Sequence, residues 1–300
     1  MSFRTETYDL ALIGGRRALD YVELTKPRLV LMVLVTTFVG FYMGSQDVPE
    51  YLRLLNTVIG TALAAGGTLA LNQAVESDID AVMERTKHRP LPDGRVQTSE
   101  CVLFGTALVV LGLMLLALTV NLLSALLTAI VVVTYLFLYT PLKQKTPLCS
   151  LVGAVPGALP PMIGWAAARN DLGLEAGILF AVLYLWQIPH NLAIARLYRD
   201  DFARGGICFL PVVDSRGRST GRHVIIHCLA LLVVSLMPTL IGFAGMLYYG
   251  TAIVLGVLFL VYGCRLALSP STSSARQLLF ASLFYLPILF FVMALDRVPV

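Results

Sequence analysis

Long apolar runs, separated by short polar segments, constrain this chain more than any other feature of its sequence. A run of about 20 apolar residues crosses the hydrocarbon core of a bilayer as a helix, and only helices or closed barrels satisfy their backbone there. The sequence therefore predicts an all-α integral membrane protein, a bundle of about nine transmembrane helices around a central apolar chamber. We expect these helices at residues 29–46, 54–75, 101–120, 122–141, 148–168, 174–197, 223–244, 246–264 and 278–295.

The balance of residue types agrees, because 57% of the chain is hydrophobic and only 13% is charged. A soluble domain carries about 25% charged residues. No polar segment is long enough to be a linker, so residues 1–300 are predicted to form one transmembrane domain. The first 25 residues mix acids and bases without an apolar stretch, so we expect residues 1–27 to be an N-terminal arm and not a cleaved signal.

Basic residues gather in alternate loops, which predicts the orientation. If the N-terminus is cytoplasmic and nine spans follow, all of the 22 Lys and Arg except Arg53, Arg169 and Arg297 lie on the inner side. This bias fits the positive-inside rule. The net charge of +4 therefore reflects topology, and we expect the lipid bilayer, and no nucleic acid, as a partner.

The end of the second span carries a row of polar residues at Asn72, Glu76 and Asp80. Their spacing of four places them on one helix face. Ionisable groups at the edge of a span are costly and usually functional, and oxygen ligands of this kind suit Mg²⁺ bound to a diphosphate. We predict that all three are catalytic metal ligands; an ordinary helix end with paired acids is the alternative. The basic loop that follows would bind the diphosphate through Arg85, Lys87 and Arg89.

The end of the sixth span is similar, because Asn191 inside the helix is followed by Asp200 and Asp201. The repetition suggests a weak internal duplication and predicts two Mg²⁺ ions that clamp one diphosphate. We predict that Asp200 is a metal ligand and that Asp201 is a second catalytic carboxylate, although the choice among these three residues stays open. Further diphosphate-binding candidates are Lys143, Arg199 and Arg204.

Together these motifs resemble those of the intramembrane (UbiA-like) prenyltransferases, and within them the branch that farnesylates haem B. The resemblance covers most of residues 21–214. It includes the Asn-x-x-x-Glu-x-x-x-Asp row, in which Glu76 replaces an Asp, and the Arg-Thr-Lys-x-Arg-Pro-Leu-Pro run from Arg85. The remaining blocks are residues 25–28, 139–143, 153–161 with 164–165, 186–190, 205–207 and 210–213.

The resemblance implies a single transmembrane prenyltransferase domain in a bacterial plasma (inner) membrane, with its active site on the cytoplasmic side. It implies Mg²⁺-dependent transfer of a farnesyl group from farnesyl diphosphate to a vinyl group of haem B, forming haem O for terminal oxidase assembly. A haem A synthase or oxidase assembly factors would be further partners. His190, beside Pro189 in the sixth span, is the candidate haem-iron ligand; a hydrogen bond to the backbone freed by Pro189 is the alternative.

The fifth span is rich in Gly and Pro over residues 153–164. Irregular backbone at membrane depth is tolerated where it lines a cavity, so we expect this span to line the central chamber. Two other functions are open. A sister prenyltransferase acting on a quinone precursor or other aromatic acceptor would share both acidic clusters but not the block 186–190. A secondary transporter would place its polar groups nearer the middle of the membrane.

Overall fold

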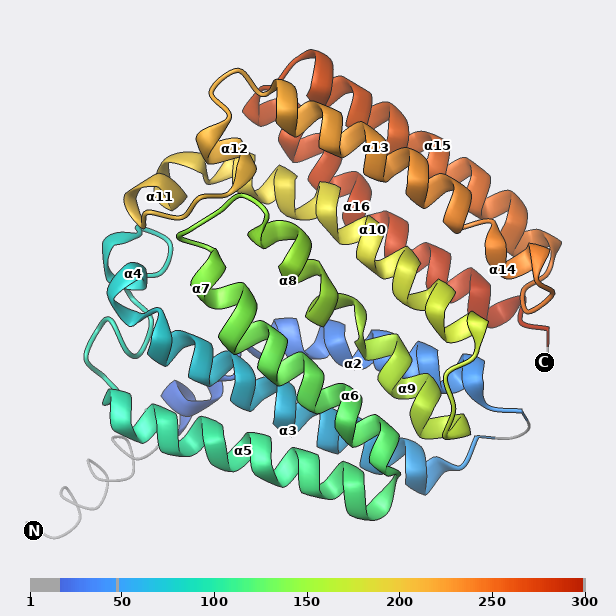
Figure 1. The fold of residues 1–300 in the computed structure, drawn as a ribbon, viewed down its shortest axis with the longest axis horizontal. Coiled ribbons are helices and arrows are strands. Elements are labelled where there is room, and N and C mark those ends of the chain that lie inside the picture. The colour runs from blue at the N-terminus through green and yellow to red at the C-terminus, as the bar shows by residue number, and fades with distance from the viewer. Residues whose placement is uncertain (1–16, 47–48, 299–300) are drawn as a thin grey trace, which may run out of the picture.

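The computed structural model describes residues 17–46 and 49–298, so most of the N-terminal arm lies outside the described residues. Within them, nine helical segments are long and apolar enough to cross a membrane, which confirms the all-α class and the number of spans (Figure 1). The cytoplasmic N-terminus stays a prediction. The spans are α2 (Pro27–Gly44), α3 (Tyr51–Val75), α5 (Thr98–Thr119), Leu122–Leu142, Cys149–Arg169, α10 (Leu174–Leu197), Arg218–Leu240, α15 (Met246–Leu268) and α16 (Thr272–Leu295).

Three spans are interrupted. The fifth divides into α8 (Cys149–Ala158) and α9 (Pro160–Arg169), and the seventh into α13 (Arg218–Val234) and α14 (Met237–Leu240). Each second half has a proline in its first turn, where the missing N–H is tolerated. The fourth span consists of α6 (Leu122–Val133), the π-helix η1 (Thr134–Tyr139) and α7 (Thr140–Leu142). The sequence predicted only the break in the fifth span.

The half-helix α9 lies in backbone contact with α2. A Cβ atom on Gly40 would lie 1.9 Å from the carbonyl oxygen of Pro161, and one on Gly164 would lie 1.9 Å from that of Thr37. Small residues allow this close approach between membrane helices, where packing replaces the hydrophobic effect as the driving force. Here the irregular fifth span holds α2 in place; its predicted role as a chamber wall stays a prediction.

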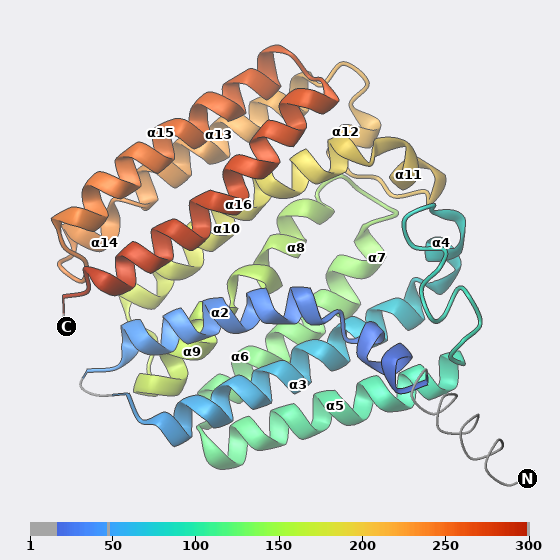
Figure 2. The same ribbon diagram turned by 180° about the vertical axis from the view of Figure 1, so that it is seen from behind.

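The largest cluster of buried side chains is formed mainly by α10, α13, α15 and α16, with contributions from α2, α8 and α9, and it includes the fully buried Tyr248, Phe259 and Tyr285. In Figure 2 the four main helices occupy one side of the molecule, and α2, α3 and α5 occupy the other. A smaller cluster around Met83 and Phe202 joins two short helices, α4 (Ser77–Val82) and α11 (Arg199–Arg204), which therefore lie together at one end of the bundle.

The two acidic segments share a local architecture. The long helix α3 is followed by one residue outside the helix, Glu76, and then by the six residues of α4. The long helix α10 is likewise followed by Tyr198 and then by the six residues of α11. The short helix α12 (Leu210–Val213) follows α11. The repeated pattern is consistent with the internal duplication suggested by the sequence.

Candidate active site

The predicted row of Asn72, Glu76 and Asp80 is buried at the junction of α3 and α4. Their exposed fractions are only 2%, 8% and 2%. The helix ends formally at Glu76, but the Glu76 N–H still donates to the Asn72 carbonyl (3.0 Å) and the Asp80 N–H donates to the Glu76 carbonyl (2.8 Å). The four-residue hydrogen-bond pattern thus continues through the break, so the three side chains stack on one face as the sequence predicted.

Asn72 is positioned by the π-helix of the fourth span. Its Nδ2 donates to Oγ1 of Thr140 (3.1 Å), and this hydroxyl donates in turn to the carbonyl oxygen of Tyr135 (2.8 Å). The bond to Thr140 holds the Asn72 side chain, and its carbonyl oxygen, the only acceptor of the amide, is the atom that could ligate a cation. The sequence prediction did not include Thr140, since no proline or glycine marks the π-helix.

Glu76 forms a buried ion pair with Lys143, whose Nζ lies 2.7 Å from Oε1 of the carboxylate. The same Nζ lies 4.6 Å from the centre of the Tyr139 ring. Burial alone would lower the pKa of Lys143, but the neighbouring tyrosines and Glu76 raise it, so the amine is charged. The Cys208 N–H donates to the Lys143 carbonyl (2.7 Å), which links this pair to the loop after α11.

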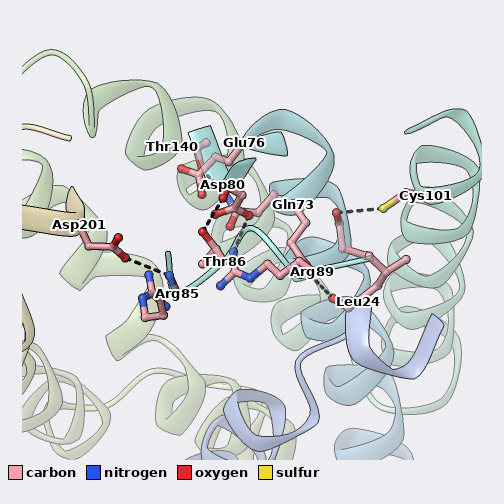
Figure 3. A network of polar contacts seen from close by, with 12 residues as sticks. Leu24, Gln73, Glu76, Asp80, Arg85, Thr86, Arg89, Cys101, Thr140 and Asp201 are labelled. Atoms are coloured by element: carbon pink, nitrogen blue, oxygen red, sulfur yellow. Dashed lines mark hydrogen bonds and ion pairs between the residues drawn. The ribbon is translucent and has the colours of Figure 1, made fainter. Parts of the chain in front are cut away.

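Asp80 is paired with Arg89 from the basic loop, with 2.5 Å between Nη1 and Oδ2. The loop is closed onto α4 by Thr86, whose hydroxyl donates to the Asp80 carbonyl (2.9 Å). Figure 3 shows Asp80 between Thr86 and Arg89, with Glu76 and Thr140 close by. Two of the six predicted diphosphate-binding cations, Arg89 and Lys143, therefore contact the carboxylates of the row.

In the second acidic segment Asp201, and not Asp200, faces the first segment. Asp201 accepts hydrogen bonds from the backbone N–H groups of Glu84 (2.8 Å) and Arg85 (3.3 Å) and from the Arg204 guanidinium (2.5 Å). Burial alone would raise the pKa of Asp201, but these donors outweigh it and lower that pKa. Asp201 thus ties the basic loop to α11 (Figure 3).

Asp200 is exposed and makes no hydrogen bond or ion pair within residues 17–46 and 49–298. It is the second residue of α11, and the second residue of α4, Asp78, is also exposed. The fourth residue is Asp80 in α4 and Phe202 in α11. The second segment therefore does not repeat the carboxylate row of the first, and its metal ligand stays a prediction.

The other predicted cations lie around the second segment or at the surface. The Arg85 guanidinium lies 5.7 Å from the Tyr198 ring centre and 5.6 Å from that of Phe202. Lys87 pairs with the exposed Glu84 at 2.6 Å, an interaction that solvent weakens. Arg199 donates to the carbonyl of Val212 (3.4 Å), and Arg204 binds Asp201 as described above.

The sequence prediction also omitted Lys26 from the site, although it belongs to the Thr25-Lys26-Pro27-Arg28 block. Lys26 precedes α2 in a left-handed conformation (φ 50°, ψ 65°). Its amine lies near both cations and both carboxylates of the row, and burial together with the like charges of Arg89 and Lys143 lowers its pKa to about 7. Within the described residues it has no ion-pair partner.

Comparison with known proteins decides the family. The UbiA prenyltransferase family matches residues 33–288, which include both acidic segments. The chain belongs to this family. Two relatives are named protoheme IX farnesyltransferase: that of Solibacter usitatus is 47% identical and that of Koribacter versatilis 43%. The alignments cover 93% of this chain in both cases and 98% and 93% of the relatives. These findings confirm the predicted resemblance, and the chain is a prenyltransferase.

Solved structures show the same fold. A digeranylgeranylglyceryl phosphate synthase superposes with a TM-score of 0.80 at 18% identity, covering 94% of this chain and 98% of the synthase. A UbiA homologue from Archaeoglobus fulgidus, bound to GPP and Mg²⁺, superposes with a TM-score of 0.61 at 17% identity, covering 92% and 99%. This chain is therefore a multi-pass membrane enzyme with the UbiA fold.

The donors of this UbiA-family site suit a hard cation. Asn72, Glu76 and Asp80 offer only oxygen atoms, which Mg²⁺ prefers. In the described part of the chain, one oxygen of each carboxylate accepts from a cation and the other has no hydrogen-bond partner. Among those residues, no group of three or more His, Cys, Asp or Glu side chains is placed so that it could hold a metal ion. The row therefore offers two carboxylates and a carboxamide, which are the kinds of oxygen donor that Mg²⁺ prefers.

His190 lies on α10 and contacts α16. Its Nδ1 is 2.7 Å from Oγ of Ser282, and Nε1 of Trp186 donates to the carbonyl of the same serine (2.9 Å). The two rings are stacked with centroids 4.8 Å apart. Ser282, and not the backbone freed by Pro189, is thus the partner of His190. The contact leaves Nε2 as the nitrogen for a ligand, and the haem-binding role stays a prediction.

Proposed function

We propose that this enzyme transfers a farnesyl group from farnesyl diphosphate to a vinyl group of haem B and forms haem O. The observation that carries the proposal is the buried row of Asn72, Glu76 and Asp80, faced by Arg89 and Lys143, at one end of an apolar bundle. The choice of haem B rests on the name of the relatives, protoheme IX farnesyltransferase.

The reaction balances with water as the third reactant. The allylic C–O bond of farnesyl diphosphate breaks, and diphosphate leaves with the bonding electrons. The farnesyl carbon forms a C–C bond to one vinyl carbon of haem B. Water supplies a hydroxyl group to the other vinyl carbon, and its proton leaves with the diphosphate.

We propose that Asn72, Glu76 and Asp80 hold Mg²⁺, with Asp200 as ligand to a second ion. When bound, Mg²⁺ neutralises the charge that develops on the departing diphosphate. The A. fulgidus homologue bound to GPP and Mg²⁺ supports this use of the metal.

The cations of the chain would bind the diphosphate directly. Arg89 and Lys143 already lie beside the row, and Lys26, which has no ion-pair partner in the described residues, adds a charge when its amine is protonated. Buried charges interact more strongly than exposed ones because the surroundings are less polarisable. Burial also keeps water from an allylic cation before the acceptor can react. Cations farther from the row would bind the outer diphosphate oxygens: Arg85, Lys87, Arg199 and Arg204.

For the acceptor, we propose that His190 ligates the haem iron through Nε2 while Ser282 fixes the ring through Nδ1. A hydrogen bond at the second nitrogen is the usual way in which proteins orient a ligating imidazole. The active-site end would face the cytoplasm of a bacterial inner membrane, and haem O would pass to a haem A synthase or to oxidase assembly factors.

The decisive experiment incubates purified protein with haem B, farnesyl diphosphate and Mg²⁺ and weighs the haem by mass spectrometry. We expect a mass gain of one farnesyl group plus one hydroxyl group, and no gain with Asp80→Asn or after chelation of Mg²⁺. Prenylation of an aromatic ring in place of haem would refute the acceptor but not the transfer. An unchanged product yield after chelation would refute the metal-dependent mechanism.

A further inference from the structure

Two adjoining cavities lie along the contact between α15 and α16, away from the carboxylate row. The first, of about 270 Å³, has a polar lining that includes Arg265, Ser269, Ser273 and Gln277. The second, of about 340 Å³, is apolar and aromatic and is also bordered by Gln277. The two cavities therefore form one groove with a polar end and an apolar end.

The groove follows a single stripe along each helix. On α15 it extends from Leu255 through Tyr262 to Arg265 and Leu268, and on α16 from Ser273 through Gln277 to Phe284. These residues recur at intervals of three or four, which is one helix face. At 1.5 Å per residue, the α15 stripe is about 20 Å long. That length matches one leaflet of the hydrocarbon core, about 15 Å, together with part of the headgroup layer.

The polar end lies at the same end of the bundle as the acidic segments. Arg196, in the last turn of α10, donates to the carbonyl of Pro270 in the loop between α15 and α16 (2.5 Å). Figure 2 shows this loop beside α12, at the end where α10 terminates. The polar end therefore lies where the headgroups of one leaflet are found, and the apolar end points into the membrane.

The groups at the polar end are those that bind a phosphate. Arg265 is exposed and contacts only the Tyr262 ring (6.0 Å), with no carboxylate partner in the described residues. The side chains of Ser273 and Gln277 make no hydrogen bond within those residues either. An arginine beside hydroxyl and amide donors is a typical phosphate site. The residues that line this cavity include no carboxylate that could hold Mg²⁺. The cavity therefore suits a phosphodiester better than a metal-bound diphosphate.

We propose that this groove binds one phospholipid with an anionic headgroup. The phosphate contacts Arg265 and Ser273, the ester region lies beside Gln277, and an acyl chain lies along Phe280 and Phe284. The lipid is a bound component of the α15–α16 pair and is neither substrate nor product of the prenyl transfer.

The test is native mass spectrometry of the purified full chain, offered equal amounts of phosphatidylglycerol and phosphatidylcholine in detergent. We expect the wild type to retain one phosphatidylglycerol, and Arg265→Gln to retain roughly tenfold less, the effect of losing one hydrogen bond to a charged group. Arg276→Gln is the matched control, because Arg276 is exposed on the same end of α16 but does not line the groove. Equal retention of the two lipids, or equal losses in the two variants, would overturn the proposal.

A second pair of variants tests the acyl part. Phe284, which is 65% exposed, lines the groove, whereas Phe291, 64% exposed on the same helix, does not. We expect Phe284→Ala to release the lipid at lower collision energy than the wild type and Phe291→Ala to behave as the wild type. Adding glycerol 3-phosphate in excess should not displace the lipid. Displacement by this soluble headgroup would show a phosphate site without an acyl groove and would overturn the proposal.

Discussion

The two acidic segments, α3–α4 and α10–α11, share one backbone pattern but use their carboxylates differently. In the first, Glu76 and Asp80 are paired with cations from other parts of the chain. In the second, Asp201 binds its own neighbour Arg204 and the backbone of the first segment's loop. The difference arises from position within the short helix: the buried acid is the fourth residue in α4 and the third in α11. The same residue types thus pair with cations in one segment and connect the two segments in the other.

The largest effect is expected at the fourth position of α4. Asp80→Asn keeps the side-chain shape but removes the charge of a proposed metal ligand, so turnover should fall by roughly 10²–10³, as for the loss of other groups that stabilise transition-state charge. Asp78→Asn, two residues earlier and exposed, should retain nearly full turnover. The measurement is the rate of prenylated haem formation by both variants. Equal losses in the two would show that the row has no special role.

The next effect concerns Asp200, the exposed acid of α11. If it ligates a second ion, Asp200→Asn should lower turnover about tenfold or more and raise the Mg²⁺ concentration needed for half-maximal rate. Its unfolding temperature should match that of the wild type, because Asp200 makes no polar contact in the described residues. A normal Mg²⁺ dependence in this variant would restrict the metal site to the first segment.

A change at Asp201 should appear chiefly in stability. Asp201→Asn weakens the acceptor for the N–H groups of Glu84 and Arg85 and for Arg204. We expect a loss of about 1–3 kcal/mol in the free energy of unfolding, the usual cost of a disrupted buried hydrogen bond. Thermal unfolding in detergent measures it. An unchanged unfolding temperature, together with a loss of turnover as large as that of Asp80→Asn, would disprove the structural role of Asp201 in joining α11 to the basic loop.

The smallest effect is a pH dependence at Lys26. Since its pKa is about 7, the amine is charged below that pH and becomes neutral above it. Binding of inorganic diphosphate should therefore weaken from pH 6 to pH 8 in the wild type. Lys26→Arg keeps its charge across this range, so its decrease should be several-fold smaller. Binding is measured by calorimetric titration of both proteins, because the ionisation of diphosphate itself contributes equally to both and drops out of the comparison. Identical pH profiles would exclude Lys26 from the anion site.

The sequence predicted the spans well because the backbone of a helix in lipid must form its hydrogen bonds within that helix. Length and hydropathy are therefore enough to locate each span. The sequence also predicted that Asn72, Glu76 and Asp80 share one helix face, since residues spaced by four lie on the same side of a helix. It could not choose between Asp200 and Asp201, because that choice depends on where α11 starts. Nor could it reveal that Thr140 holds Asn72, because that contact joins segments 68 residues apart.

The π-helix in the fourth span has a consequence for how such a site can be gained or lost. At Thr140 the backbone N–H reaches back five residues to Tyr135, so the turn holds one residue more than an α-helix would. Each residue of an α-helix rotates the chain by about 100°. If Thr134–Tyr139 formed a regular α-helix at its full length, Thr140 and Lys143 would be rotated by about 100°, away from Asn72 and Glu76. A one-residue deletion within the π-helix would therefore keep Thr140 beside Asn72, whereas substitutions that favour the α-helical pitch would separate them and leave the membrane topology intact.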